Sequence, residues 1–193
     1  MKVKDGGTEH RNRLLRDVAG GDKAAFEELY RLASHNVFRH LASSLADREA
    51  ARDLTHDTFL EVWRKAATFK GECAALTWIL TIATNKLRDH LRRSDGRLIF
   101  TDDEARLDSV SEPESQLESL SRSELQRLVQ KVLPRLSAVH RQVIDLTSYH
   151  NLTVSEIARI MDCPENTVKT RMFFARQRLK ALLAEEGVSK DTI

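Results

Sequence analysis

The side chains with the clearest chemical potential are a group of basic residues close to the C-terminal end of the chain. Among them, apolar residues recur at three- and four-residue spacing, which predicts a helix with one buried stripe. The cations fall largely outside this stripe, where they can neutralise phosphates while the helix lies in the major groove of DNA. The apolar set is Val168, Met172, Ala175, Leu179 and Leu182, and the basic set is Lys169, Arg171, Arg176, Arg178 and Lys180.

A second helix must hold this basic helix in place, and the preceding sequence contains a helix start signal. Thr153 and Glu156 have the spacing of a capping box, in which each side chain bonds the other residue's backbone N–H. Apolar residues then repeat up to Met161, and Pro164 suits the first position of the next helix because its missing N–H would have no partner there. Residues 152–183 therefore predict a helix, a tight turn and a basic helix, a DNA-binding arrangement. An ordinary helical hairpin with a solvated basic face is the alternative.

Basic and aromatic residues also mix between residues 69 and 93. A helix expected from Leu76 to about Arg93 has a cationic second half, and Phe69 and Trp78 lie near its start. This combination suits single-stranded nucleic acid, because phosphates attract cations and unstacked bases stack on flat rings. Trp78 is equally well explained as a core residue, so both interpretations of its ring stay open.

Acidic side chains line much of a helix expected to follow Asp47. This face predicts either a protein-docking surface or plain solubility, and periodicity alone favours solubility. A further acidic run over residues 95–121 predicts a flexible linker. Its Asp102-Asp103-Glu104 cluster is better explained by solvation than by a metal site, because no histidine or rigid element supports it.

Composition and cysteine usage set the broad class of protein. The 193 residues are 31% charged and 41% hydrophobic, with seven glycines and three prolines, as expected for a mostly helical chain of two small domains. The formal net charge of +2 means that any nucleic-acid signal lies in how the charge is distributed. No apolar run approaches the roughly 20 residues of a membrane span, so we expect a cytoplasmic protein. Cys73 and Cys163 lie far apart without a CxxC motif, which predicts neither a disulfide nor a zinc site.

The remaining helices are predicted from apolar periodicity and from residues that favour helix N-caps. A short helix is expected over residues 8–19. Asp22, Asp47, Ser123 and Ser137 are expected to cap the helices that follow them. The predicted fold class is all-α, with two small helical domains joined by the acidic linker. The expected boundaries are 1–21 for an N-terminal tail and short helix, 22–94 for the first domain, 95–121 for the linker, 122–186 for the second domain and 187–193 for a C-terminal tail.

Both predicted domains resemble parts of the sigma-70 family of RNA polymerase sigma factors. Residues 53–63 (DLTHDTFLEVW), Phe69-Lys70-Gly71 and the segment from Thr77-Trp78-Ile79 to Arg93 are similar to region 2 of that family. The sequence MDCP, followed by TVKTR and ARQRLKALL, is similar to region 4. The compact form with only these two regions resembles the extracytoplasmic-function (ECF) group, whose regions 2 and 4 are a helical bundle and a helix-turn-helix.

The resemblance implies a role for each surface. The helix carrying residues 53–63 would dock on the clamp of core RNA polymerase, the loop and helix over residues 72–93 would melt and read the minus-10 promoter element, and the basic helix would read the minus-35 duplex. His56 stands where the family usually has Gln, Asn166 where Gly is usual, and Phe174 where Arg is common. The implied contact residues are Asp53, Leu54, His56, Asp57 and Glu61 for polymerase; Trp78, Asn85, Lys86, Arg88, Arg92 and Arg93 for minus-10 DNA; and Asn166, Lys169, Thr170, Arg171, Phe173, Phe174 and Arg178 for minus-35 DNA.

The function implied by the resemblance is that of an alternative sigma factor. It would bind core RNA polymerase through its clamp and flap regions and open promoter DNA, with no catalytic residue, cofactor or metal of its own. An anti-sigma factor is a further expected partner, and no stable homo-oligomer is expected. The alternatives are a sigma-like decoy that binds only an anti-sigma factor, a metal-dependent nuclease using the acidic linker, and a stand-alone repressor. The basic helix argues against the decoy, and a repressor leaves the region 2 resemblance unexplained.

Overall fold

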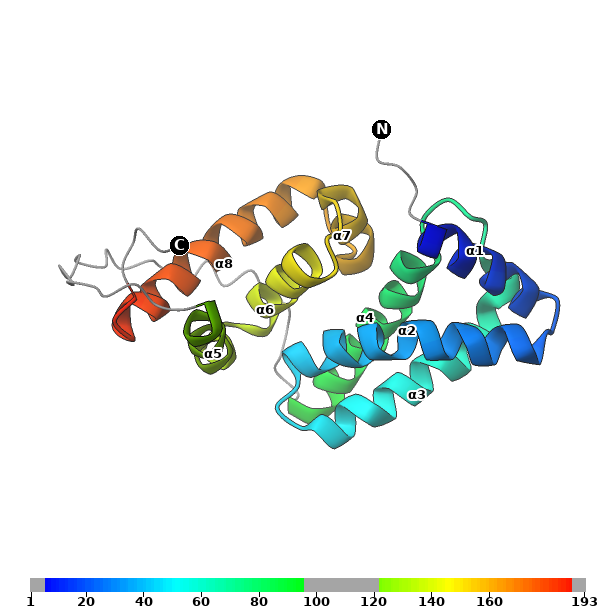
Figure 1. Cartoon of the computed structure of the whole chain (residues 1–193), viewed down its shortest axis with the longest axis horizontal. Helices are drawn as coiled ribbons and strands as arrows, with labels where there is room; N and C mark the ends of the chain where they lie inside the picture. The colour runs from blue at the N-terminus through cyan, green and yellow to red at the C-terminus, as the bar shows by residue number, and fades with distance from the viewer. Residues whose placement is uncertain (1–5, 96–121, 189–193) are drawn as a thin grey trace.

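The computed structural model describes residues 6–95 and 122–188, and the predicted acidic linker therefore lies almost wholly outside the described residues. The first described part is a bundle of four helices (Figure 1). Its core contains leucine, phenylalanine and isoleucine side chains that are exposed by 2% or less. The helices are α1 (Gly6–Ala19), α2 (Lys23–Ser44), α3 (Arg48–Lys65) and α4 (Ala75–Asp95).

The helix starts of this bundle follow the predicted N-caps. The Asp22 carboxylate accepts from the backbone N–H groups of Ala24 and Ala25, and the Asp47 carboxylate accepts from Glu49. These bonds satisfy donors that have no partner inside the helix. The caps fix where α2 and α3 begin, and so which side chains α3 presents outward.

The second described part contains the predicted helix-turn-helix (Figure 1). Ser137 caps its helix as predicted, by accepting from His140 N–H. Two details of the prediction are wrong. Ser123 lies inside a helix rather than at its N-cap, and Pro164 is the N-cap residue of α8 rather than its first residue. The elements are α5 (Arg122–Val132), α6 (Ala138–Ile144), a π-helical turn (Asp145–Tyr149), α7 (Val154–Met161) and α8 (Glu165–Glu185).

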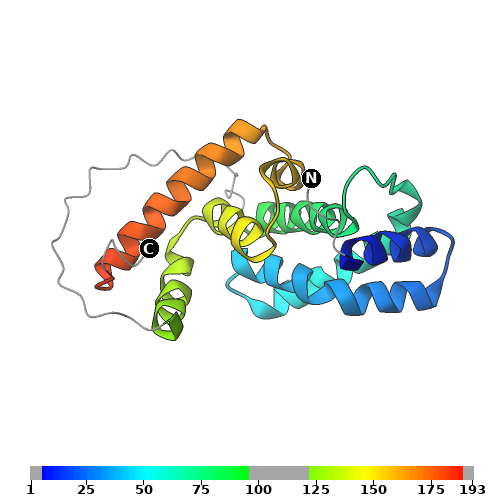
Figure 2. The same cartoon turned by 45° about the horizontal axis from the view of Figure 1, so that its top comes forward.

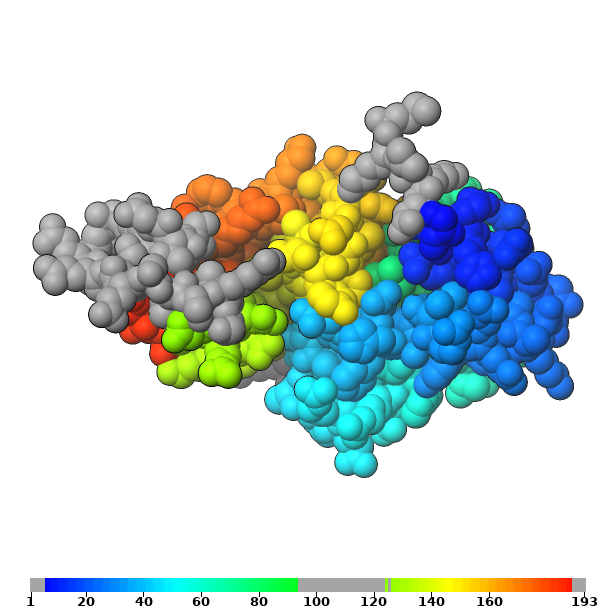
Figure 3. Space-filling model, in the orientation of Figure 1, coloured from blue at the N-terminus to red at the C-terminus, as the bar shows by residue number. Residues whose placement is uncertain are grey.

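The two parts pack directly against each other. Helix α6 lies on α2, and α7 lies beside α4, in both cartoon views (Figures 1 and 2). The space-filling view shows the side chains of α6 and α2 in contact (Figure 3). Val143, Leu146 and Ile157 of the second part belong to the same buried apolar cluster as the core of the first. Apolar periodicity predicted two small helical domains but not this shared core.

Candidate nucleic-acid and partner-binding surfaces

The helix-turn-helix is built by the predicted capping box and by a left-handed residue at the turn. Thr153 Oγ1 accepts from Glu156 N–H at 3.3 Å, and a Glu156 carboxylate oxygen accepts from Thr153 N–H at 2.8 Å. Asp162 then adopts φ 51° and ψ 54°, a conformation that Asp tolerates better than most residues. It ends α7 and turns the chain sharply into α8.

Helix α8 presents the predicted cationic face to solvent and buries the predicted apolar stripe. Val168, Ala175 and Leu182 have no exposed surface, whereas Lys169 and Arg178 are exposed. Arg171 is half-buried, and its guanidinium donates to Cys163 Sγ at 3.5 Å. This hydrogen bond holds the Arg171 side chain against the turn between α7 and α8.

The polar and aromatic residues at the start of α8 are also placed on its outer face. Asn166 and Thr170 are exposed, and the Thr170 hydroxyl donates to the Asn166 carbonyl oxygen at 3.0 Å. Phe173 is 57% exposed. Its ring lies edge-to-face on half-buried Phe174, with centroids 5.4 Å apart. An exposed ring of this size on a cationic helix offers apolar contact to a thymine methyl group.

On α4, the residues predicted to face minus-10 DNA occupy different environments. Asn85, Arg92 and Arg93 are exposed. Arg88 is half-buried because it donates to Asn85 Oδ1 and, across the boundary between the two parts, to the Met161 carbonyl oxygen at 3.1 Å. Arg92 is also engaged, because its guanidinium donates to Asp89 Oδ1 at 2.7 Å.

Trp78 is half-buried and packs against the core. Its ring meets Phe69 edge-to-face at 5.7 Å between centroids. The core interpretation therefore describes the packing of Trp78, and its contact with nucleic acid stays a prediction.

Helix α3 exposes the predicted polymerase-facing residues on one side. Asp53, His56 and Asp57 are exposed, whereas Leu54 is 9% exposed and belongs to the core. Glu61 is half-buried, and its carboxylate accepts from Lys65 Nζ at 2.9 Å. This hydrogen bond lowers the pKa of Glu61.

A groove joins the α3 and α4 surfaces, with a cavity of about 270 Å³. Acidic side chains from α3 and basic side chains from α4 meet across it. The predicted polymerase surface and the predicted minus-10 surface are therefore contiguous. The lining residues are Ala50, Asp53, Leu54, Asp57, Lys86, Asp89, His90 and Arg93.

Leu60 is a residue of this surface that sequence reasoning missed. Its side chain is 54% exposed, although it lies among the acidic residues of α3 rather than in the core. The signal was present, because Leu60 falls outside the apolar stripe of Leu54, Phe59 and Val62 on the same helix. A large apolar side chain on an exposed charged face favours contact with another protein.

None of the described helices is long and apolar enough to cross a membrane.

Comparison with known families gives two matches in chain order. Residues 25–97 match the family described as Sigma-70 region 2, and residues 126–179 match Sigma-70, region 4.

Several bacterial transcription factors are similar to the chain along most of its length. The ECF RNA polymerase sigma-E factor of Haemophilus influenzae is 31% identical over 177 residues, which cover 86% of this chain and 92% of that protein. The ECF RNA polymerase sigma factor SigK of Mycobacterium tuberculosis is 32% identical over 173 residues, with coverage of 88% and 91%. The RNA polymerase sigma-H factor of Pseudomonas aeruginosa is 27% identical over 182 residues, with coverage of 91% and 94%.

Two solved structures share the fold. The sigma factor RpoE of Bartonella quintana, in complex with the anti-sigma factor NepR, has a TM-score of 0.59 and 26% identity, and covers 82% of this chain and 96% of its own. CnrH, in complex with the cytosolic domain of CnrY, has a TM-score of 0.66 and 24% identity, with coverage of 91% and 98%.

Proposed function

The chain belongs to the sigma-70 family of RNA polymerase sigma factors, within the ECF group, and from this premise we propose which of its surfaces carries each step of transcription initiation. It is an alternative sigma factor that directs transcription initiation. The observation that carries this function is the pair of family matches in order, regions 2 and 4, along one chain. Its partners are core RNA polymerase and promoter DNA, and the polymerase places its action in the cytoplasm.

The minus-35 element binds to the outer face of α8. Lys169 and Arg178 neutralise phosphates and fix the register of the helix on the duplex. Phe173 supplies an apolar contact to base edges, and Asn166 and Thr170 supply polar contacts near the N-terminus of α8. Phe174 supports the Phe173 ring from below rather than contacting DNA itself, because it is half-buried against that ring.

The minus-10 element binds along the exposed face of α4. Pulling a base out of its stack costs a few kcal/mol, which aromatic stacking and hydrogen bonds in a pocket can offset. Asn85 offers an exposed amide for a flipped base, and Lys86, Arg92 and Arg93 bind the phosphates around it. The exposed part of Trp78 stacks at the start of this face.

Core polymerase binds to the acidic face of α3. Asp53, Asp57 and Glu61 provide charge complementarity to a basic partner, which steers association. Leu60 inserts into an apolar site of the clamp and adds apolar burial to this contact. His56, which is exposed beside Tyr30, contacts the same partner. Region 4 provides the contact with the flap.

The described arrangement is a closed form, and promoter binding requires it to open. The names of the two promoter elements place them about 25 base pairs apart, or about 85 Å at about 3.4 Å per base pair. In this structure α7 contacts α4. Helix α8 follows α7 directly and is about 32 Å long, at about 1.5 Å per residue. The two DNA-facing helices are thus too close to reach both elements at once. Opening releases Arg88 from the Met161 carbonyl oxygen and makes its guanidinium available to DNA.

An anti-sigma factor is the proposed inhibitory partner, by analogy with RpoE of Bartonella quintana, which is solved in complex with the anti-sigma factor NepR. Such a partner would bind the same surfaces that polymerase and DNA use. The sigma-factor assignment is preferred to the decoy alternative because α8 keeps an exposed cationic face, for which a decoy has no use.

Run-off transcription tests the proposed function directly. Purified core polymerase is combined with promoter fragments from the source genome, with and without this protein. We expect discrete transcripts only when the protein is present, and loss of these transcripts when Asn85, Arg92 and Arg93 are replaced together by alanine. Core polymerase that gains no promoter-specific transcript from any fragment would contradict the proposal.

A further inference from the structure

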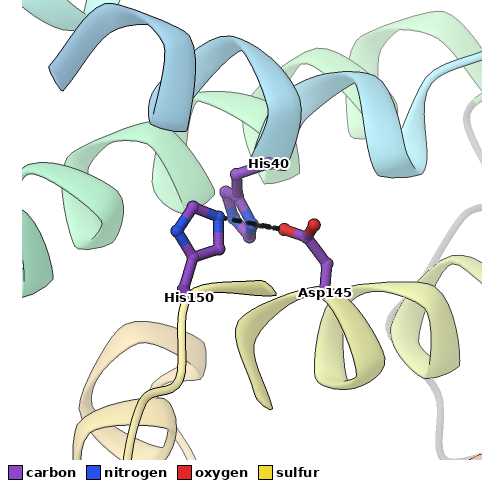
Figure 4. Close-up of side chains that lie close together, drawn as sticks. All are labelled: His40, Asp145 and His150. Carbon is purple, nitrogen blue, oxygen red and sulfur yellow. Dashed lines mark hydrogen bonds and ion pairs between the residues drawn. The ribbon is translucent and has the colours of Figure 1, made fainter. Parts of the chain in front are cut away.

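Two histidines and one aspartate form a buried cluster at the boundary between regions 2 and 4. His40 comes from α2, whereas Asp145 begins the π-helical turn of region 4 that faces it and His150 follows the last residue of that turn (Figure 4). Their side chains are exposed by 0%, 5% and 1% respectively. One potential ligand atom from each residue lies within 4.8 Å of the other two. None of the proposed polymerase or DNA contacts uses these side chains.

The π-helical turn explains why Asp145 and His150 point the same way. His150 N–H donates to the Asp145 carbonyl oxygen at 3.2 Å, which is the five-residue spacing of a π-helix. One turn of this wider helix stacks the two side chains on the same side, whereas an α-helix would separate them around its axis. Single π-turns inside helices often occur at functional sites.

The distances in the cluster fit a tetrahedral transition-metal ion. Asp145 Oδ2 lies 3.4 Å from His40 Nδ1 and 3.3 Å from His150 Nε2. An ion with bonds of about 2.0–2.1 Å sets tetrahedral ligand atoms about 3.3–3.4 Å apart. The two imidazole nitrogens lie within 4.8 Å of each other. We propose that His40, Asp145 and His150 bind one divalent ion of the zinc class between regions 2 and 4, with a fourth position open to water.

The surroundings of the cluster match those of metal-binding histidines. His40 Nε2, the nitrogen away from the cluster, lies 2.9 Å from the Thr84 hydroxyl. A hydrogen bond on the outer nitrogen fixes ring orientation and tautomer, so that the inner nitrogen can bind metal. The other oxygen of Asp145 lies 3.4 Å from Arg39 Nε. The partners of both outer atoms therefore come from region 2.

Without an ion, one nitrogen of the cluster has no hydrogen-bond partner among the described residues. When His40 Nε2–H donates to Thr84, the lone pair of Nδ1 faces the Asp145 carboxylate. His150 Nε2 is buried and has no hydrogen-bond partner among the described residues, although the same carboxylate lies nearby. Two imidazole nitrogens and a carboxylate oxygen are a suitable ligand set for a cation of the zinc class.

The ion would fasten region 2 to region 4, because each side supplies at least one ligand. Any effect of the ion on promoter binding rests on the proposed function, in which the closed form must open. Metal binding itself does not depend on that function and is measured on the isolated chain without polymerase or DNA. A failure of one proposal is therefore distinguishable from a failure of the other.

Co²⁺ titration of the chelator-treated full chain tests the site. We expect one Co²⁺ per chain with the intense visible absorption of a tetrahedral ion, displaced by one equivalent of Zn²⁺. His40→Gln in region 2 and His150→Gln in region 4 should each weaken binding by more than about 100-fold, and Thr84→Val by about 10- to 100-fold, as for loss of an outer partner. The matched control is His35→Gln, an exposed position on the same helix as His40, which should leave the affinity unchanged.

Two results would overturn the proposal. One is the pale spectrum of an octahedral ion or no spectrum at all, which would mean that imidazole N–H groups hold the carboxylate without metal. The other is tetrahedral absorption that persists in both His40→Gln and His150→Gln. Circular dichroism and thermal melting check that each variant folds. The NMR signals of the His40 and His150 rings in the unaltered chain give a readout without any substitution, since they must shift on addition of Zn²⁺.

Discussion

Lys169 and Phe173 are exposed on the same face of α8 but offer different chemistry to DNA. A lysine that binds phosphate contributes equally to all sequences, whereas an aromatic ring against a thymine methyl group discriminates between bases. The structure supports this division, because Lys169 is exposed and Phe173 stands on the ring of Phe174. Affinity and specificity of the minus-35 contact should therefore depend on different residues.

Lys169→Ala is expected to make the plot of log affinity against log salt less steep, by about 0.9 in slope, because one fewer phosphate is neutralised. Phe173→Ala should leave this slope unchanged and reduce the discrimination between wild-type and altered minus-35 sequences. The measurement is binding of the reconstituted holoenzyme to promoter duplexes over a range of salt concentrations. Lys23→Ala, exposed on α2, is the control. Identical effects of the two α8 substitutions would contradict the division of roles.

Cys73 is expected to be an unreactive thiol. Burial raises the pKa of Cys73, and Arg159 beside it offsets only part of that effect. Because the thiolate is the reactive form, alkylation at neutral pH should be several-fold slower in the folded chain than in urea. Mass spectrometry of a Cys163→Ser variant after timed iodoacetamide treatment measures the rate. Equal rates in the two states would show that the thiol is freely ionised, and would reopen a redox role.

At the level of single residues, exposure was predictable where a helical face decides it, but hydrogen-bond partners were not. The outward placement of Lys169 and the burial of Val168 both follow from helical spacing. The hydrogen bond from Arg88 to Met161 does not follow from spacing, because the two residues lie 73 positions apart and belong to different regions. Spacing along a helix carries no information about such a partner.

Helix α3 carries the outer face that we propose to bind core polymerase. Leu60 interrupts an otherwise charged surface, and Glu61 beside it is held by Lys65. An exposed leucine contributes little to the stability of the free chain, so its substitution should not affect folding. Its contribution should be visible when polymerase covers the face.

Leu60→Ser is expected to weaken binding to core polymerase by about 5- to 30-fold, which corresponds to about 1–2 kcal/mol of lost apolar burial. Fluorescence anisotropy of labelled protein with purified core polymerase measures the affinity. Phe173→Ser is the matched control, because Phe173 is similarly exposed but lies on the proposed DNA face. An unchanged affinity for Leu60→Ser, or an equal loss for Phe173→Ser, would remove Leu60 from the proposed interface.

Among the elements, helix starts were more predictable than changes of helix type. Asp22, Asp47, Ser137 and Thr153 act on backbone groups two or three residues away, so the local sequence contains the whole signal. The π-helical turn at residues 145–149 has no such local signal. It places Asp145 against His40 of α2, a residue 105 positions away in the chain. This is why the histidine and aspartate cluster could not be found from the sequence.

For the whole molecule, the resemblance predicted the fold of each half, but the sequence did not predict how the halves pack. The apolar faces of α6 and α7 would be expected to pack inside region 4. Nothing in their periodicity shows that Val143 and Ile157 join the core of region 2. Polar contacts complete the interface. Arg141 donates to the Ser44 carbonyl oxygen at 3.2 Å, and Thr77 donates to Glu156, the residue that also closes the capping box of α7. The interface thus uses side chains that also have local roles.

The closed form makes a prediction that concerns the entire chain. Glu72 in region 2 and Arg159 on α7 form an exposed ion pair, with a carboxylate oxygen 3.8 Å from a guanidinium nitrogen. Replacing both residues by cysteine, with Cys73 and Cys163 changed to serine, allows a cleavable bis-maleimide to join regions 2 and 4. Because the joined chain cannot reach two distant promoter elements, run-off transcript should fall in proportion to the crosslinked fraction, and cleavage of the reagent should restore it.

The controls separate closure from chemical damage. Glu72→Cys and Arg159→Cys, each alone in the same serine background and treated with the same reagent, should retain activity, because neither can bridge the two regions. Anisotropy with core polymerase shows whether the crosslinked protein still binds through α3, whose outer face lies away from the crosslink on Glu72 and Arg159. If the fully crosslinked protein initiates as well as the single-cysteine proteins, then the contact between α4 and α7 persists during initiation. In that case Arg88 would have to act from its position against Met161, and opening would not be the step that admits promoter DNA.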